Sequence, residues 1–241
     1  MVDLQNTLPP MRLLTISFNT LIRPWEVPIF RSAVAKKVGL EHDLYHNHNN
    51  QNGMDTAEYH HRYPLIQYKQ HQGRPMLLCL EAGVDALQHL FEQPDLSIDM
   101  AGTSRPLRVG RLDMRHHDFD NGGEERAYHL RDWLALNEEN YANYTQCKGK
   151  VAEIRLLEKI LQNQLVALCY AFGQTPPEAL EVCIQDLREP RWIDYKDVKI
   201  RCFSIEFSAR INLPNYLGLG KGASTGWGVL RRLRMEMPEN I

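Results

Sequence analysis

The segment FSIEFSARINLPNYLGLGKGASTGWGVLRRLRM, residues 203–235, contains the clearest strand of the chain and its densest group of glycines. Apolar and polar residues alternate from Phe203 to Ile211, which predicts a half-buried β-strand. The LPNYL that follows is long enough for one helical turn at most. GLGKGASTGWG then places five of the fifteen glycines between Gly218 and Gly228, and WGVLRRLRM is expected to form the last strand.

The pattern strand, helix, strand, strand, helix, strand is expected twice along the chain. In the first copy, helices are expected from Pro24 to Lys37 and around residues 84–91. The strands expected around them are at residues 14–18, 62–70, 76–80, 96–100 and 107–114. The second copy has a strand at 128–136, a long helix with an apolar stripe from Ile154 to Phe172, a strand at 180–187, and then the segment quoted above.

This order predicts an α+β protein made of two tandem ferredoxin-like (RRM-like, βαββαβ) domains with a C-terminal glycine-rich loop. In the second domain the glycine-rich loop replaces most of the last helix. The most loop-like stretch between the two copies is DFDNGGEER, residues 118–126. The domain boundary is therefore expected there, with domains at 1–120 and 121–241.

Composition is typical of a globular protein outside the membrane. Of 241 residues, 43% are hydrophobic and 24% are charged, and no apolar run approaches the ~18 residues that span a bilayer. The N-terminal MVDLQNTLPP lacks the pattern of a signal peptide, so a cytoplasmic location is expected. The five cysteines are widely spaced in apolar segments, which predicts reduced core residues rather than disulfides or a metal site.

Basic charge gathers in the C-terminal part of the chain. The net charge is −2, but residues 198–241 carry seven basic and three acidic side chains, a local charge of +4. Such a concentration of positive charge is expected where the phosphates of a nucleic acid bind.

Two familiar phosphate-binding motifs do not match the glycine-rich segment. A P-loop requires Ser or Thr directly after its lysine, but Gly222 follows Lys221. A dinucleotide-binding motif requires a helix and a further strand, and only 13 residues follow Gly228. Successive free N–H groups in a glycine-rich loop can instead form a concave site for an anion.

The loop pattern Gly218-Leu219-Gly220, Lys221 to Thr225, Gly226-Trp227-Gly228 resembles the signature loop of CRISPR-associated RNA-processing endoribonucleases of the repeat-associated mysterious protein (RAMP) superfamily. Three further segments resemble one subgroup of these enzymes: LYHNHNN (44–50), RYPLIQYK (62–69) and DWLALNEENYANY (132–144). Family loops often carry Arg or Lys just before the second glycine pair, where this chain has Thr225. The resemblance implies that the loop binds RNA through Gly218, Gly220, Lys221, Gly222, Ser224, Thr225, Gly226 and Gly228. The local positive charge adds Arg231 and Arg232 of the following strand as expected RNA-binding residues.

Histidines are the candidate catalytic residues. Five of the ten lie within 20 residues of one another: His42, His46, His48, His60 and His61. RNA cleavage without a metal needs a base for the 2′-hydroxyl and an acid for the departing 5′-oxygen, and histidine can serve as either. His46 and His48 would point the same way on an extended segment, and the resembling subgroup places its catalytic residues at this position. Lys37 and Tyr59 are expected to support them because they are close in the sequence.

The function expected from the resemblance is metal-independent cleavage of CRISPR repeat RNA, which turns the precursor into guide RNAs with 2′,3′-cyclic phosphate ends and needs no cofactor. Two alternatives remain open. The protein could be a RAMP subunit of an effector complex that binds RNA without cutting it. It could also be a metal hydrolase, because His-x-His with His60 or His61 is a possible ligand set for zinc. Repeat RNA is the expected partner, with other effector subunits and a second copy of the chain as further possible partners.

Overall fold

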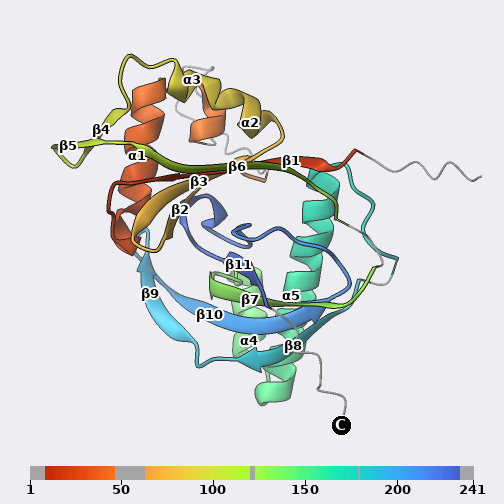
Figure 1. Ribbon diagram of the computed structural model, residues 1–241. Coiled ribbons are helices and arrows are strands. Elements are labelled where there is room, and N and C mark those ends of the chain that lie inside the picture. The colour runs from red at the N-terminus through yellow and green to blue at the C-terminus, as the bar shows by residue number, and fades with distance from the viewer. Residues whose placement is uncertain (1–8, 47–62, 120–122, 179, 234–241) are drawn as a thin grey trace, which may run out of the picture. The chain divides into compact units, whose positions relative to one another are not determined.

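The structure is a computed structural model that describes residues 9–46, 63–119, 123–178 and 180–233 (Figure 1). The chain divides into two compact units. The N-terminal unit comprises Pro10–His117 together with Ser224–Gly226. Among the described residues, the C-terminal unit comprises Asp118–Ala223 and residues 227–233, together with Pro9.

The N-terminal unit contains a four-stranded antiparallel sheet in the order β2-β3-β1-β6. Its strands are β1 (Met11–Phe18), β2 (Ile66–His71), β3 (Arg74–Leu80) and β6 (Val109–His117). Its helices are α1 (Val27–Val38), α2 (Ala82–Ala86) and α3 (Gln88–Phe91), with 3-10 turns η1 (Pro24–Glu26) and η2 (Asp43–Tyr45). This order of elements and strands is that of a ferredoxin-like fold. A separate hairpin is formed by β4 (Ser97–Met100) and β5 (Thr103–Pro106).

Helix α1 packs its apolar side into the core of this unit. Phe30, Val34 and Val38 are buried at helical spacing. The Phe30 ring makes edge-to-face contacts with Phe18 of β1 and Tyr68 of β2, at centroid distances of 6.2 and 5.6 Å. These contacts hold α1 against the sheet, and the histidine segment follows α1 in the chain.

The C-terminal unit repeats the same topology, with strand order β11-β7-β10-β8. Its strands are β7 (Arg126–Trp133), β8 (Val182–Leu187), β9 (Arg191–Tyr195), β10 (Val198–Ala209) and β11 (Val229–Arg232). Its helices are α4 (Glu138–Thr145) and α5 (Lys150–Ala171), and only the 3-10 turn η3 (Ala223–Thr225) lies between β10 and β11 among the described residues. Strand β9 pairs with the first half of β10 and extends it as a hairpin.

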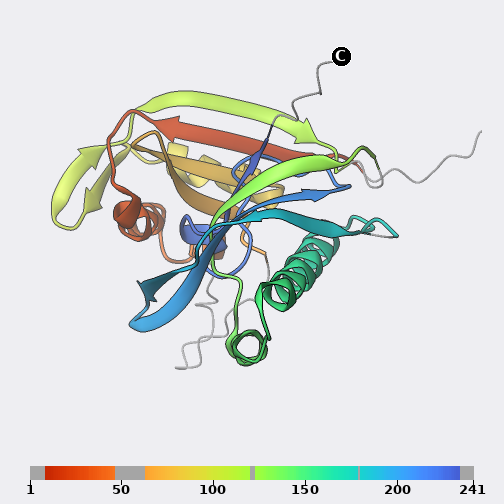
Figure 2. The ribbon, with the colours of Figure 1, turned by 90° about the horizontal axis from the view of Figure 1, so that it is seen from below.

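Helix α5 lies along one face of this sheet (Figure 2). Leu157, Leu161, Leu165 and Leu168 are buried on the helix, and Phe203, Ile205 and Phe207 are buried on β10. Two hydrogen bonds join the helix to the sheet: Trp133 Nε1 donates to Gln164 Oε1 at 3.0 Å, and the Ile184 N–H donates to Glu158 Oε1 at 2.9 Å.

The predicted pair of ferredoxin-like folds is confirmed. Several details differ from the sequence prediction. The helix expected at 84–91 is split into α2 and α3, and the strand expected at 96–100 belongs to the β4–β5 hairpin instead of the main sheet. Strand β9 was not predicted. None of the described helices is both long and apolar enough to cross a membrane.

The expectation that all five cysteines are core residues is wrong at two positions. Cys79, Cys169 and Cys202 are buried, and Cys147 is partly exposed. Cys183 is exposed, because it lies on the outer strand β8 next to Ile184, and successive strand residues point to opposite faces.

Candidate nucleic-acid interface

The backbone of the glycine-rich loop adopts conformations that only glycine tolerates well. Gly220, Gly222, Gly226 and Gly228 have φ values of +78°, +74°, +88° and +59°. A Cβ on Gly228 would lie 1.8 Å from the carbonyl oxygen of Leu219. Here the backbones approach so closely that no side chain fits, so glycine is required by the fold of the loop itself.

Hydrogen bonds tie the two ends of this loop to each other and to the end of β7. The Gly228 N–H donates to Asp132 O at 2.8 Å, and the Lys221 N–H donates to Leu134 O at 3.1 Å. Within the loop, the N–H groups of Leu219 and Trp227 donate to carbonyl oxygens of Gly228 and Gly222. These four amides are therefore satisfied inside the protein and are not the free anion-binding N–H groups expected from the sequence.

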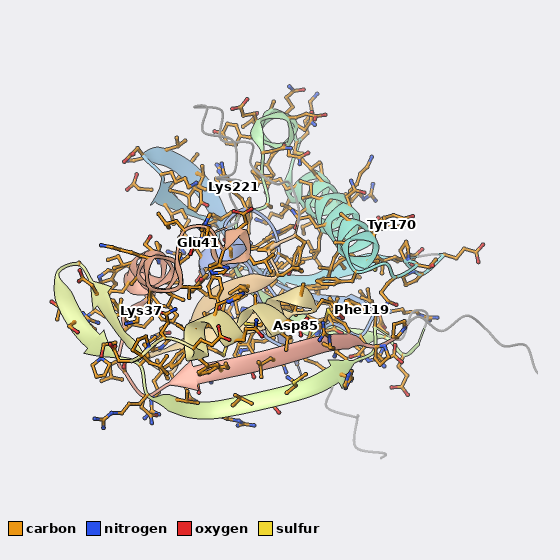
Figure 3. The ribbon with its side chains drawn as sticks, turned by 90° about the horizontal axis from the view of Figure 1, so that it is seen from above. Lys37, Glu41, Asp85, Phe119, Tyr170 and Lys221 are labelled. Atoms are coloured by element: carbon orange, nitrogen blue, oxygen red, sulfur yellow. The ribbon has the colours of Figure 1, made fainter. Side chains whose placement is uncertain are left out.

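Cations and aromatic rings surround the loop instead. Lys221 is exposed (labelled in Figure 3), and its Nζ lies 5.5 Å from the centre of the Tyr195 ring. Lys196 Nζ lies 6.0 Å from the centre of the same ring. The edge of Tyr195 also contacts Trp227, with ring centres 6.0 Å apart and planes at 82°. Two ammonium groups and two aromatic rings thus adjoin one another at the loop.

Tyr195 reaches the loop because of the β9–β10 hairpin. The two turn residues, Lys196 and Asp197, have φ values of +49° and +63°. Positive φ at both central residues is the geometry of a type I′ turn, which joins two paired strands tightly. Asn-Gly is the usual sequence for this turn, and its absence explains why sequence reasoning missed β9 and the hairpin.

A second aromatic and cationic group lies further along the hairpin. Arg201 of β10 is opposite Trp192 of β9, with its guanidinium 5.1 Å from the Trp192 ring centre and 5.3 Å from that of Tyr144. The Trp192 side chain is 53% exposed. Burial, followed by the hydrogen bond to Glu153, raises the pKa of Tyr144 to about 12, so its phenol stays protonated at neutral pH. An exposed ring held over a cation is a suitable surface for stacking a base.

The predicted arginines of the last strand lie on β11. The Arg231 guanidinium sits 3.9 Å from the centre of the Tyr216 ring. Arg232 is exposed, and its backbone N–H donates to Asn215 Oδ1 at 2.7 Å. The predicted loop hydroxyls, those of Ser224 and Thr225, belong to the short segment that is assigned to the N-terminal unit, whereas both arginines belong to the C-terminal unit.

The histidine segment is described only as far as His46. This side chain is 8% exposed, and its Nε2 lies 2.7 Å from the carbonyl oxygen of Leu40. Because a carbonyl oxygen only accepts, this contact assigns a ring proton to Nε2. The His46 carbonyl oxygen accepts from the Arg31 guanidinium. His48 and Tyr59 lie outside the described residues, as do His60 and His61.

The residues before His46 are firmly anchored. Tyr45 is 1% exposed, and its hydroxyl donates to Ala86 O at 2.8 Å. The Tyr68 hydroxyl donates to Tyr45 O at 3.0 Å. Lys37, in contrast, lies in the last turn of α1 with Nζ 3.2 Å from Asp95 Oδ1 (Figure 3). An exposed ion pair of this kind is weak, so it does not fix the lysine in one position.

Two family models match the chain in succession: the Cas6b N-terminal domain at residues 10–118 and the Cas6b C-terminal domain at residues 122–233. The chain belongs to the Cas6b family. Among curated proteins, one similar sequence is the uncharacterized protein MJ0978 of Methanocaldococcus jannaschii. It is 35% identical over 104 residues, which are 43% of this chain and 69% of that protein.

Solved structures share the fold. A crystal structure of Cas6b matches with a TM-score of 0.82 at 22% identity, over 92% of this chain and 99% of that one. A second, named CRISPR RNA processing endoribonuclease Cas6b, matches with a TM-score of 0.67 at 22% identity over the same shares. Csf5, a type IV Cas6 crRNA endonuclease, matches with a TM-score of 0.55 at 14% identity, over 93% of this chain and 99% of that one. The Cas6b architecture of this chain is thus shared with proteins of low sequence identity.

Proposed function

We propose that the protein is an endoribonuclease that binds CRISPR repeat RNA and cleaves the precursor transcript into guide RNAs. The observation that carries the proposal is the match of both Cas6b domain families in order along the chain. The relatives of the same fold named CRISPR RNA processing endoribonuclease and crRNA endonuclease support it. The histidines lie in the predicted N-terminal domain (1–120), and the RNA-binding loop lies in the C-terminal one (121–241).

The proposed reaction needs no metal or other cofactor. One histidine accepts the proton of the 2′-hydroxyl, and the 2′-oxygen attacks the adjacent phosphorus. The bond from phosphorus to the 5′-oxygen breaks, and an acid protonates that oxygen. The products are a 2′,3′-cyclic phosphate and a 5′-hydroxyl. We assign these roles to His46 and His48, with Lys37 and Tyr59 stabilising the charge on the phosphate.

In the proposed complex, RNA contacts the glycine-rich loop through side chains more than through loop amides. Lys221, Arg231 and Arg232 supply positive charge for phosphates, and Ser224 and Thr225 supply hydroxyl groups. Trp192 and Tyr195 add ring faces on which unpaired bases can stack. The backbone conformation that positions the loop is held by Gly220, Gly222, Gly226 and Gly228, which all have positive φ. Gly218 forms a β-bridge with Val229 at the start of β11. We place this activity in the cytoplasm, where the transcript is made.

The test is single-turnover incubation of the purified protein with repeat RNA in EDTA, followed by analysis of the product ends. We expect cleavage at one position and a 3′ end that can be ligated only after the cyclic phosphate is opened and removed. A matched RNA with a 2′-deoxy nucleotide at the scissile position should bind equally well and remain uncut. Binding without cleavage would indicate an effector subunit that does not cut, and cleavage that EDTA abolishes would indicate a metal hydrolase.

A further inference from the structure

His46 is bound by its surroundings through its backbone and through its ring. Its N–H donates to Asp43 O at 3.2 Å, and its Nε2 lies 2.7 Å from Leu40 O. Both of these partners belong to the short segment that leads to His46, so they would move with it. The His46 carbonyl oxygen differs, because it accepts a hydrogen bond from Nη2 of Arg31 on helix α1.

Helix α1 gives Arg31 a fixed position. Phe30 precedes it, Val34 lies one turn after it, and both of these side chains are fully buried. A close-packed core of this kind resists a shift of the helix. The guanidinium therefore ties the backbone of His46 to the core of the N-terminal unit.

The peptide before His46 is held from a second element. The Tyr68 hydroxyl of β2 donates to Tyr45 O at 3.0 Å, so two successive carbonyl oxygens are bound by donors from β2 and α1. Complete burial raises the pKa of Tyr68 well above its usual value, so the hydroxyl keeps the proton that it donates. Together the two donors fix the course of the backbone at His46.

The positive charge of Arg31 is directed at this carbonyl oxygen. Among the described residues no carboxylate forms an ion pair with Arg31. A hydrogen bond from a charged donor is roughly twice as strong as one between neutral groups. Replacing Arg31 leaves no carboxylate without its partner, so we expect its variants to fold.

We propose that Arg31 is a positioning residue for RNA cleavage, which holds the backbone of His46 so that the imidazole keeps its place at the scissile phosphate. This inference rests on the proposed function and on the role of His46 in it. Arg31 acts through His46 and makes no contact with the RNA. A displacement of about 1 Å at a reacting group can lower a rate roughly 100-fold, so this hydrogen bond matters more for the rate than for stability.

The first test replaces the guanidinium and keeps the length of the side chain. Arg31→Met removes the charge and the donor but retains a long apolar stem. We expect its single-turnover cleavage of repeat RNA to slow roughly tenfold or more, with RNA affinity nearly unchanged. Arg31→Lys should recover most of the wild-type rate, because a single hydrogen bond to a carbonyl oxygen does not need the planar fork of a guanidinium.

Arg74→Met is the matched control. Arg74 is exposed in the same unit and also donates to a neutral oxygen, Asn19 Oδ1, at 2.8 Å. Its loss should leave the cleavage rate unchanged. Thermal melting of all variants shows whether a slower rate reflects a less stable protein, and a rate that falls equally in Arg74→Met and Arg31→Met would overturn the proposal.

The decisive measurement is the double variant Arg31→Met/His46→Ala. Residues that act as a unit have non-additive effects, so the double variant should cleave no more slowly than His46→Ala alone. If the two losses multiply instead, Arg31 acts on the RNA independently of His46 and the positioning role is wrong.

Amide hydrogen exchange in the segment 40–46, measured without RNA, tests the same contact independently of cleavage. Exchange should be faster in Arg31→Met than in the wild-type protein and close to wild type in Arg31→Lys. Unchanged exchange in Arg31→Met, or a wild-type cleavage rate in that variant, would overturn the proposal. A wild-type protein that cuts no repeat RNA would instead refute the proposed function, and the exchange result would still decide whether Arg31 holds His46.

Discussion

Replacing Gly228 with alanine should destabilise the protein through a backbone contact that glycine alone permits. The residue has a φ of +59°, which costs alanine about 1–2 kcal/mol. The new Cβ would lie 1.8 Å from Leu219 O, so the loop must move. That movement weakens the hydrogen bonds from Gly228 N–H to Asp132 O and from Leu219 N–H to Gly228 O, each worth about 0.5–1.5 kcal/mol.

The expected total is a loss of about 3 kcal/mol in the free energy of unfolding, and the Tm should fall by roughly 9 °C for a chain of this size. Gly173→Ala is the matched control. Gly173 also has a positive φ, +67°, but apart from its neighbours in the sequence no atom of the described residues lies within 4 Å of its Cβ position. This variant should therefore lose only the conformational part, about 1 kcal/mol or roughly 3 °C.

The assay is thermal unfolding of the two variants and wild-type protein, with RNA affinity measured on the same preparations. Equal Tm losses for Gly228→Ala and Gly173→Ala would refute the reasoning, because the steric contact would then contribute nothing. A Gly228→Ala protein with wild-type Tm and reduced RNA affinity would place the glycine at the RNA instead of in the fold of the loop.

Four other predictions test the site. His46→Ala or His48→Ala should lower the single-turnover cleavage rate by roughly 100-fold with little change in RNA affinity, and wild-type rates from the double variant would contradict this. Lys221→Ala should reduce the slope of log affinity against log salt by about 0.7, and an unchanged slope would argue against a phosphate contact. Trp192→Ala should weaken binding of single-stranded RNA by about 1–3 kcal/mol at unchanged Tm; if affinity stays the same, the ring does not stack on a base. Gly222→Val should lower the Tm and weaken RNA binding more than Lys221→Ala, because its Cβ would lie 2.7 Å from the Trp227 ring and the loop must move; the reverse order of affinities would contradict this.

The fold was predictable because hydrophobic residues recur at one regular spacing along each main element, every second residue in a strand and every third or fourth in a helix. The alternation from Phe203 to Ile211 corresponds to β10, and the apolar stripe from Ile154 corresponds to α5. Strand β10 begins earlier than predicted, at Val198, because its first half pairs with β9. That pairing depends on a type I′ turn at Lys196-Asp197, which carries none of the usual sequence signals.

The site was less predictable because its properties depend on tertiary contacts. The sequence shows that glycines gather around Lys221, but not that the amides at the ends of the loop are already hydrogen-bonded to β7 and to each other. It shows a histidine pair, but not that His46 is nearly buried with Nε2 held by a carbonyl oxygen. Which ring nitrogen donates follows from that contact, and no sequence pattern encodes it.

The glycines of the signature loop therefore determine its backbone conformation, and the RNA-binding groups that we propose are neighbouring side chains. Leu219 O occupies the space of a Gly228 side chain, and the Trp133 ring and Leu134 O lie 2.8 Å from a Cβ on Gly220. These contacts would require glycine even in a protein that bound nothing. Lys221, in contrast, is exposed, and the tight hairpin and the loop bring its ammonium group next to the ring of Tyr195. A substitution at a signature glycine thus tests RNA recognition only when the melting temperature is unchanged, whereas a substitution of the cation tests it directly.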